Sequence, residues 1–366
     1  MGSARRLVRL PGPLAMRCGG VLPQVDIAYE TWGALSPAKD NVLLLVTGLS
    51  PSAHARSSAE DPTPGWWEEM IGPGQPLDTD RFHVVCVNSL GSPHGSTSPA
   101  AIDPRTGEPY RVTFPVLTIE DIATAAREAL RALGLPRVRV VVGPSLGGMT
   151  ALAYAIQFPG EVDALVSVSA AARATPFAIA VRSVQREAIR SDPEWRGGSY
   201  EPPGPVNGLR VARKLGLITY RSAAEWRQRF SRERVDVRAP GAGPFDVEFE
   251  IEAYLEMHAQ KFVGTFDANC YLYLSRAMDL FDVAEHGGSV EAGLGRIQAH
   301  RTLVVGVETD FLFPIDQQEE IARLLERAGR DVRFVRLPSI QGHDSFLVDH
   351  DRFGPTLGPF LQDVAG

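Results

Sequence analysis

Cysteine is scarce in this sequence, which has three cysteines in 366 residues. Cys18, Cys86 and Cys270 are too few and too widely separated for a disulfide framework or a zinc site, so we expect no metal ion and a reducing, cytoplasmic setting. Long apolar runs are also missing, and none approaches the ~18 residues that a membrane-spanning helix needs. The sequence therefore predicts neither a metal site nor a membrane partner.

Basic residues are also fewer than acidic residues. The 37 Lys and Arg residues are outnumbered by 44 Asp and Glu residues, which leaves a net charge of -7. An acidic field opposes phosphate backbones, so no nucleic-acid partner is expected, and an anionic substrate must meet a local basic pocket. The content of 44% hydrophobic and 22% charged residues is ordinary for a globular protein, which excludes wholesale disorder.

Short β-branched runs alternate with helical patterns towards both ends of the chain. A helix is expected over residues 119–133, with Thr118 as its N-cap and Gly134 as its stop. Another is expected over residues 312–328, with Pro314 near its start. Several runs are continuously apolar, as strands buried on both faces are, so the alternation predicts an α/β fold with a mostly parallel sheet. The expected strands are residues 25–29, 42–46, 82–87, 138–142, 164–168, 302–307 and 332–337.

The middle of the chain differs from both ends. From about residue 175 to residue 294 there is little strand signal, and amphipathic helical stretches take its place. A helical insertion between two strands of one sheet explains this change without a second core. We therefore predict a core of residues 1–174 and 295–366 and an inserted helical lid of residues 175–294. The expected lid helices are residues 177–190, 209–215, 223–230 and 249–262.

The strongest local motif is Gly143-Pro144-Ser145-Leu146-Gly147-Gly148. It follows an expected strand and precedes a helical pattern, which is the context of a nucleophile elbow. Glycines two positions on either side of Ser145 make room for the sharp turn that lifts its hydroxyl clear of the sheet. The alternative is a glycine-rich turn with an incidental serine. On the functional interpretation, Ser145 is a nucleophile and the amide of Leu146 donates to an oxyanion.

A nucleophilic serine of this type needs an acid and a base, in the chain order Ser, Asp or Glu, His. Asp310 follows the expected strand 302–307, and His343 follows the strand 332–337. Both therefore lie at the sheet edge that also holds Ser145, where His343 would take the serine proton and Asp310 would orient the imidazole. Asp310 could instead be a helix N-cap and His343 a solvated histidine. Glu308 and Asp316 are alternatives for the acid.

The loop after the strand 42–46 reads Thr47-Gly48-Leu49-Ser50-Pro51. In an architecture with a nucleophile elbow, the loop after an early strand supplies the second oxyanion amide. We predict that the amide of Leu49 has this role. A plain turn after a strand is the alternative.

Together these features resemble the homoserine O-acyltransferase family of the α/β-hydrolase superfamily. The similarity covers nearly the whole chain, and it is strongest to the L-serine O-acyltransferase branch, in which serine O-succinyltransferases and a serine O-acetyltransferase look most similar. The matching stretches include residues 29–33, 65–67, 71–74, 78–81, 88–91, 95–97, 106–110, 145–149, 216–220 and 342–344, and for the serine branch residues 47–51, 181–183, 185–190, 220–223, 254–256 and 269–275.

The resemblance implies several roles for individual residues. Arg213 and Tyr220 match positions that hold the amino-acid substrate, and an arginine fork suits a carboxylate. Asp344 matches the residue taken to bind the substrate ammonium. Arg182 matches a position linked to the choice of acyl-CoA, where a guanidinium could pair with the free carboxylate of a succinyl group. A solvated helix arginine is the alternative for Arg182. The loop formed by Pro51, Ser52, Ala53 and His54 matches the stretch associated with acceptor choice.

The resemblance also implies an activity. We expect an enzyme that transfers an acyl group from acyl-CoA to the hydroxyl of L-serine, with succinyl-CoA as donor, in cysteine biosynthesis. No permanently bound cofactor is expected, and relatives form homodimers through the lid. The alternatives are serine O-acetyltransfer, homoserine acylation in methionine biosynthesis, an esterase or thioesterase, and a non-catalytic scaffold on the same fold.

Overall fold

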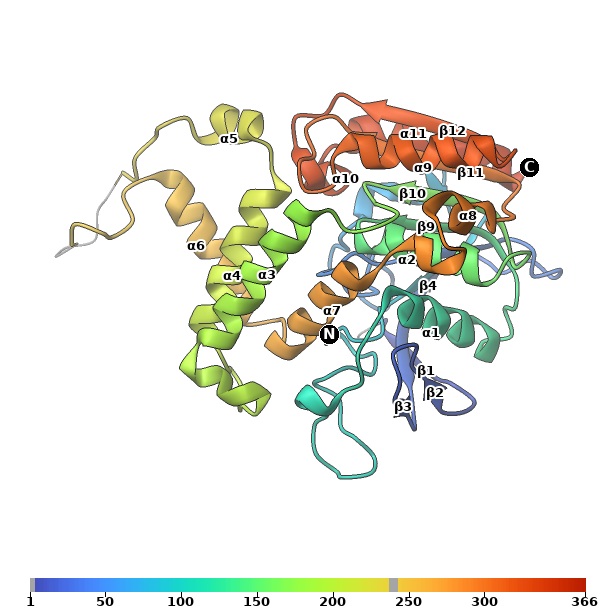
Figure 1. The fold of residues 1–366 in the computed structure, drawn as a ribbon. Helices are drawn as coiled ribbons and strands as arrows, with labels where there is room; N and C mark the ends of the chain where they lie inside the picture. Colours follow the sequence, from blue (N-terminus) through green and yellow to red (C-terminus); the bar gives the residue numbers. More distant parts are fainter. Residues whose placement is uncertain (1–3, 237–242) are drawn as a thin grey trace.

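The centre of the computed structural model, which describes residues 4–236 and 243–366, is an eight-stranded sheet (Figure 1). The first neighbours, β1 with β4 and β4 with β8, pair antiparallel. All later neighbours pair parallel. This confirms the predicted α/β class. In sheet order the strands are β1 (Arg6–Arg9), β4 (Asp26–Trp32), β8 (His83–Val87), β5 (Val42–Val46), β9 (Val138–Pro144), β10 (Val162–Val168), β11 (Arg301–Val307) and β12 (Asp331–Leu337).

The strands of the parallel part are apolar on both faces because both faces are covered. In β5, Val42, Leu44 and Val46 enter one core cluster, whereas Leu43 and Leu45 enter the other. This alternation follows from the two-residue period of a strand. All seven strands expected from the sequence are present, with ends within three residues of the prediction. The edge strand β1 was not predicted.

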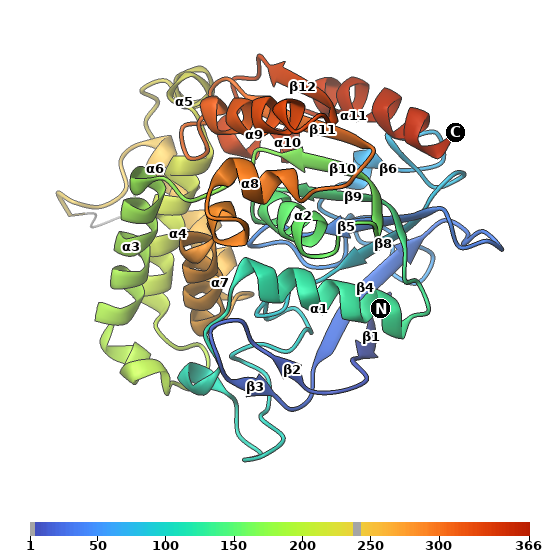
Figure 2. The ribbon, with the colours of Figure 1, turned by 45° about the vertical axis from the view of Figure 1, so that its right-hand side comes forward.

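Helices cover the two faces of the sheet. Figure 2 shows α1 (Ile119–Ala132), α2 (Leu146–Gln157), α8 (Val290–Gly295) and α9 (Ile315–Arg327) in front of the sheet, and their buried side chains belong to the larger core cluster. The second face is covered by α11 (His350–Ala365) together with Trp67 and Phe346. The predicted N-cap of α1 is confirmed: Thr118 forms a capping box with Asp121. Gly134, after the helix, has the positive φ of a stop residue.

The insertion between β10 and β11 is helical, and Figure 1 shows much of it beside the sheet. Its packing is sequential, with α3 against α4 and α4 against α6. Of the later helices, α7 contacts both α3 and the core helix α1, and α8 contacts the core helix α9. These contacts join the insertion to the core. The helices are α3 (Pro176–Ser191), α4 (Val206–Tyr220), α5 (Ala223–Phe230), α6 (Glu250–Val263), α7 (Ala268–Leu280) and α8.

Several helices depart from the sequence expectation. α4 is longer than the expected residues 209–215, and α8 was not expected. α7 was missed because it is buried on nearly all sides, so its sequence has no polar face. α11 was missed because it contains Pro355 and Pro359, which usually end helices. α9 begins at Ile315 rather than at residue 312, because the amides of Leu312 and Phe313 bond to the carboxylate of Asp310. None of the helices in the described residues is long and apolar enough to cross a membrane.

The remaining elements are short. Two strand pairs, β2 (Leu14–Ala15) with β3 (Val21–Leu22) and β6 (Ile71–Gly72) with β7 (Leu77–Asp78), lie outside the main sheet. A single helical turn, α10 (Ser345–Val348), precedes α11. The 3₁₀ turn Gly342–Asp344 lies between β12 and α10, and it is this turn that carries His343.

Candidate active site

Ser145 lies on a sharp turn between β9 and α2. Its φ of 57° and ψ of −122° are unusual for a residue with a side chain. A Cβ built on Gly143 would lie 2.1 Å from the carbonyl oxygen of Gly147, and one on Gly147 would lie 2.4 Å from that of Val46. Both glycines are therefore needed for the close passage of the backbone that forms this turn.

A chain of hydrogen bonds joins Ser145, His343 and Asp310. The distance from Ser145 Oγ to His343 Nε2 is 2.8 Å, and the distance from His343 Nδ1 to Asp310 Oδ2 is 2.6 Å. All three residues are buried. Because Nδ1 donates to the carboxylate, Nε2 is left to accept from the serine hydroxyl. This is the geometry of a nucleophile, a base and an orienting acid.

Two loops bring Asp310 and His343 together at the end of the sheet. Asp310 follows β11, and its second oxygen accepts from the amides of Leu312 and Phe313 at 3.0 and 2.8 Å. Thr309 ties the two loops, since its hydroxyl donates to the carbonyl of Ser339 and accepts from the amide of Gly342. The structure therefore brings Asp310 to His343, and Pro314 is the N-cap of α9.

The other two acids considered from the sequence lie elsewhere. Glu308 and Asp316 are both exposed. Asp316 lines a surface depression with Arg173 and Arg323, away from His343.

The pKa of His343 is raised above its ordinary value of 6.5. Burial lowers it, but the charge of Asp310 and the hydrogen bond to Asp310 raise it by more. The phenyl ring of Phe313 stacks on the imidazole with the ring centroids 4.9 Å apart. The environment thus favours the imidazolium that forms when the histidine takes a proton.

We expect kcat/KM for acyl-CoA to fall at acidic pH with an apparent pKa above 6.5. Only neutral His343 can accept the proton of Ser145, and a raised pKa moves the loss of the neutral form to higher pH. The measurement is the initial rate at low acyl-CoA from pH 5 to pH 9, with circular dichroism at each pH to monitor folding. An acidic limb centred below 6.5 in a folded enzyme would contradict this expectation.

The two amides predicted for the oxyanion come from the start of α2 and from the loop after β5. Leu146 is the first residue of α2, where helix amides have no partner within the helix and carry partial positive charge. Leu49 lies in the loop after β5, and this loop lines the same cavity as Ser145 through Gly48, Leu49, Ser50 and Pro51.

The cavity above Ser145 is small. Its volume is about 110 Å³, which is on the order of seven times what a single water molecule needs. The inserted segment forms part of its wall through α3, α4 and α7, and α10 contributes Phe346 and Leu347.

Arg213 and Tyr220 of α4 line this cavity, as the resemblance implied. The guanidinium of Arg213 lies 4.5 Å from the ring centroid of Phe262 and 5.8 Å from that of Tyr220. Its Nη1 donates to Ser50 Oγ at 3.2 Å. Its Nε is buried and has no hydrogen-bond partner among the described residues. Aromatic rings thus pack against the guanidinium group of Arg213. No carboxylate of the described residues lies within ion-pair distance of it.

Asp344 also lines the cavity, next to His343. Burial raises the pKa of Asp344, and the charge of Arg221 opposes this rise. Arg221 Nε lies 3.4 Å from Asp344 Oδ2. Asp344 therefore faces the cavity with a cationic neighbour behind it.

Arg182 of α3 is buried, and the alternative of a solvated helix arginine is therefore wrong. Its Nε donates to Asp279 Oδ1 at 2.5 Å. Its Nη1 and Nη2 are buried without hydrogen-bond partners in the described part of the chain, and Arg182 lines the cavity. Both terminal nitrogens of Arg182 are thus left without a hydrogen bond in a residue that lines the cavity.

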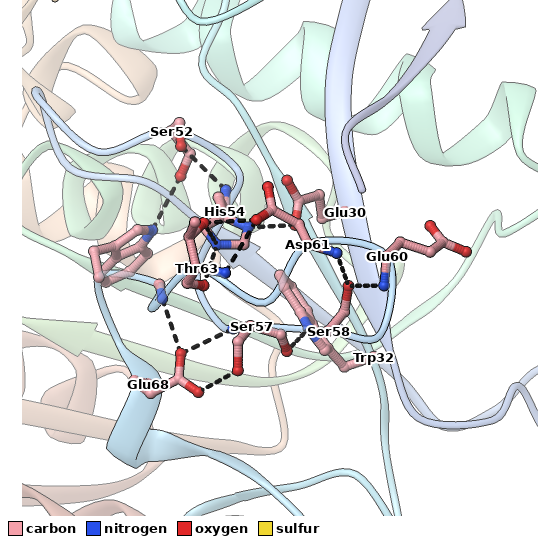
Figure 3. Close-up of polar contacts among 12 residues, drawn as sticks. Glu30, Trp32, Ser52, His54, Ser57, Ser58, Glu60, Asp61, Thr63 and Glu68 are labelled. Carbon is pink, nitrogen blue, oxygen red and sulfur yellow. Dashed lines mark hydrogen bonds and ion pairs between the residues drawn. The ribbon is translucent and has the colours of Figure 1, made fainter. Parts of the chain in front are cut away.

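The loop matched to acceptor choice reaches the cavity through Pro51, and Ser52, Ala53 and His54 lie outside its lining. Figure 3 shows Ser52 and His54 among their polar neighbours, which include Glu30 and Thr63. His54 Nδ1 lies 2.9 Å from Glu30 Oε2, and His54 Nε2 lies 2.8 Å from the carbonyl of Thr63. The carbonyl of Ser52 accepts from Trp66 Nε1 at 3.0 Å. Ser52 and His54 thus hold the loop against β4 and the segment before Trp67.

Sequence reasoning missed Asp279, Ser275 and Thr309. The spacing of Arg182 and Arg186, four residues apart in a helix, was the available signal for Asp279, since two arginines on one buried helix face need a carboxylate opposite them. No comparable signal exists for Thr309. Among the described residues, no group of three or more His, Cys, Asp or Glu side chains could hold a metal ion.

Comparison with known proteins agrees with this geometry. Residues 41–349 match the family model of the alpha/beta hydrolase fold. The chain therefore belongs to the α/β-hydrolase family. Two solved structures superpose over most of the chain: homoserine O-acetyltransferase from Bacillus anthracis, with a TM-score of 0.89, 28% identity and 98% of each chain covered, and esterase E22, with a TM-score of 0.88, 31% identity and coverage of 98% and 99%.

Sequence relatives narrow the class further. The serine O-succinyltransferase of Litchfieldella anticariensis is 61% identical over 363 residues, covering 99% of both chains. That of Frateuria aurantia is 56% identical over 367 residues, covering 100% of both. Within the α/β hydrolases, the chain is therefore a member of the serine and homoserine O-acyltransferase family, and it is an acyltransferase. The resemblance predicted from the sequence is confirmed.

Proposed function

We propose that this protein transfers the succinyl group of succinyl-CoA to the hydroxyl of L-serine, giving O-succinyl-L-serine and free CoA. The observation that carries the proposal is the pair of arginines, Arg182 and Arg213, in the cavity above Ser145. Each has a buried N–H without a partner among the described residues. A succinyl carboxylate and an amino-acid carboxylate would supply two anions for them. The names of the relatives at 61% and 56% identity support the same reaction.

In the first half of the proposed reaction, Ser145 Oγ attacks the thioester carbonyl carbon while His343 Nε2 takes the hydroxyl proton. The amides of Leu49 and Leu146 hold the oxyanion, and Asp310 stabilises the imidazolium. The carbon–sulfur bond then breaks. CoA leaves as the thiol after His343 returns the proton to sulfur, and an acyl ester remains on Ser145.

In the second half, L-serine takes the place of CoA. Arg213 and Tyr220 bind its carboxylate, and Asp344 binds its ammonium group. His343 takes the proton from the substrate hydroxyl, whose oxygen attacks the acyl ester, and the bond to Ser145 Oγ breaks as that oxygen regains a proton. Water must be excluded, or the acyl-enzyme hydrolyses, and the helical segment between β10 and β11 would provide this exclusion.

Hydrolysis is the second candidate function, because one of the solved structures that superpose on this chain is an esterase. Fold and triad geometry are common to esterases and acyltransferases. The two cationic side chains in so small a cavity favour transfer between charged substrates. Acetyl-CoA as donor and L-homoserine as acceptor are the nearest alternatives within transfer itself.

The biological setting is also part of the proposal. Acylation turns the serine hydroxyl into a good leaving group, so that sulfide can replace it in cysteine biosynthesis. We place the enzyme in the cytoplasm as a homodimer that pairs through the inserted helices. Support for this pairing comes from large apolar side chains that are exposed there: Phe177 and Val184 on α3, Val211 and Ile218 on α4, and Met257 on α6.

The test is a matrix of succinyl-CoA and acetyl-CoA against L-serine and L-homoserine, with products identified by mass spectrometry. The expected outcome is the highest kcat/KM for succinyl-CoA with L-serine. Free succinate formed at the same rate without an acceptor would establish hydrolysis instead. If acetyl-CoA gave the highest kcat/KM, the proposed donor would be wrong. If L-homoserine gave the highest kcat/KM, the proposed acceptor would be wrong.

In the same matrix, Arg182→Leu should lower kcat/KM for succinyl-CoA about a hundredfold, the size of losing a charged hydrogen-bonded pair, and leave acetyl-CoA nearly unchanged. Arg190→Leu is the matched control, because Arg190 is on the same helix but is exposed and lies outside the cavity lining. An equal loss of kcat/KM with both acyl-CoA donors would contradict the role of Arg182 in selecting the acyl donor.

A further inference from the structure

Behind the cavity, α3 and α7 carry a buried cluster of Arg182, Arg186 and Asp279. Asp279 Oδ1 accepts from Arg182 Nε at 2.5 Å, and its Oδ2 lies 2.6 Å from Arg186 Nη2. Arg186 Nη1 donates to Ser275 Oγ at 2.9 Å. The side chains of Arg182 and Asp279 are 5% and 2% exposed, and that of Arg186 is 14% exposed. One carboxylate is therefore shared between two guanidinium groups.

The formal charge of this cluster is +1, because arginine stays protonated in proteins. Were Asp279 paired with Arg182 alone, the pair would be neutral and would attract an anion weakly. Arg186 prevents this, since its Nη2 forms an ion pair with the second oxygen of the carboxylate. The cluster therefore keeps one positive charge that no carboxylate within it balances, and Arg182 Nη1 and Nη2 are buried nitrogens of the cluster without hydrogen-bond partners in the described residues.

The three residues differ in their access to the substrate. Arg182 lines the cavity above Ser145, whereas Asp279 and Arg186 do not. Arg186 lines a separate, larger depression between α3 and α7, of about 820 Å³. Holding Nε fixes the plane of the guanidinium, which is rigid, and so fixes the direction of its two terminal nitrogens. Asp279 thus acts on a bound acyl group through Arg182, and Arg186 acts through Asp279 and through Ser275, which lines the cavity.

We propose that Asp279 and Arg186 are positioning residues for donor selectivity: Asp279 orients Arg182 towards the acyl group, and Arg186 keeps the cluster cationic so that it selects a carboxylate-bearing acyl donor. This inference rests on the proposed function. It assigns the selectivity to the net charge of three residues on two helices, not to the single side chain that meets the substrate.

The test uses the ratio of kcat/KM for succinyl-CoA to kcat/KM for acetyl-CoA. Arg186→Gln makes the cluster neutral, and we expect the ratio to fall about tenfold, as a unit charge near a partly buried site would cause. Arg186→Lys, which keeps the charge, should stay within about threefold of the parent. The double variant Arg186→Gln with Asp279→Asn returns the formal charge to +1 and keeps an acceptor oxygen beside Arg182 Nε, so it should recover most of the ratio.

Arg190→Gln is the matched control. Arg190 lies one turn along α3 and lines the same outer depression, but the cluster does not include it. The Arg190→Gln exchange should leave the ratio unchanged. If the arginines only attracted the CoA phosphates, each variant would instead change kcat/KM for both donors. If Arg186→Gln does not fold, Arg186→Met provides the same charge change.

The outcomes separate this inference from the proposed function. A parent enzyme that uses succinyl-CoA, together with an Arg186→Gln enzyme whose ratio is unchanged, or a double variant that stays as low as the single one, would overturn the inference and leave the function standing. A parent enzyme that cannot use succinyl-CoA would overturn both.

Discussion

Replacing Ser145 with alanine is expected to lower kcat for acyl transfer by about 10⁴- to 10⁶-fold, as loss of a triad nucleophile does in other serine enzymes. The alanine keeps Cβ in the same strained turn but cannot form the acyl ester. Intact-protein mass spectrometry with acyl-CoA alone should show the parent enzyme gaining the mass of one acyl group and the variant gaining none.

The control for this change is Ser199→Ala, because Ser199 is exposed and lies outside the cavity lining. Its rate and its acyl-enzyme signal should equal those of the parent. A Ser145→Ala enzyme that retains full activity would show that the nucleophile is a different residue.

Replacing Asp310 with asparagine is expected to lower kcat by about 10⁴-fold, the effect of the same exchange in another Ser-His-Asp enzyme. The oxygen of an asparagine at position 310 would be taken by the amides of Leu312 and Phe313, which bond to Asp310 Oδ1. Its NH₂ group would then face His343 Nδ1. The imidazole would have to carry its proton on Nε2, where it can no longer accept from Ser145.

The control here is Asp316→Asn, which changes an exposed carboxylate close in sequence. It should leave kcat unchanged. The thermal midpoint of both variants should be measured, because Asp310 also joins β11 to α9. An Asp310→Asn enzyme that is folded and active within about tenfold of the parent would contradict the orienting role, since loss of that role costs about 10⁴-fold.

The triad positions could be predicted because their signals are local. Gly143 and Gly147 flank Ser145 in the spacing that a tight strand–helix turn requires, and Asp310 and His343 each follow a continuously apolar strand. Parallel strands end at one edge of the sheet, so residues that follow different strands lie near each other. Chain order and strand ends were therefore sufficient to bring together three residues spread over 198 positions.

The choice of the triad acid shows what local sequence patterns cannot determine. Glu308, Asp310 and Asp316 all lie just after β11, and a sequence pattern ranks them only weakly. Their distances from His343 depend on the path of the loop before α9, which the amides of Leu312 and Phe313 set by bonding to Asp310. Likewise, His54 belongs to a stretch matched to acceptor choice, yet its ring pairs with Glu30.

The sequence alone determined the parallel sheet, the helical insertion and the turn that presents Ser145, because strand and helix periods, glycine spacing and turn residues act over a few neighbouring positions. Only the tertiary structure decided how buried charge is arranged. Arg182 and Asp279 are 97 positions apart, and whether an arginine is solvated, neutralised or left cationic against a cavity depends on which side chains the packing of α3 against α7 places beside it. Electrostatic energy inside a protein is set by distance and burial, and neither is encoded within one helix.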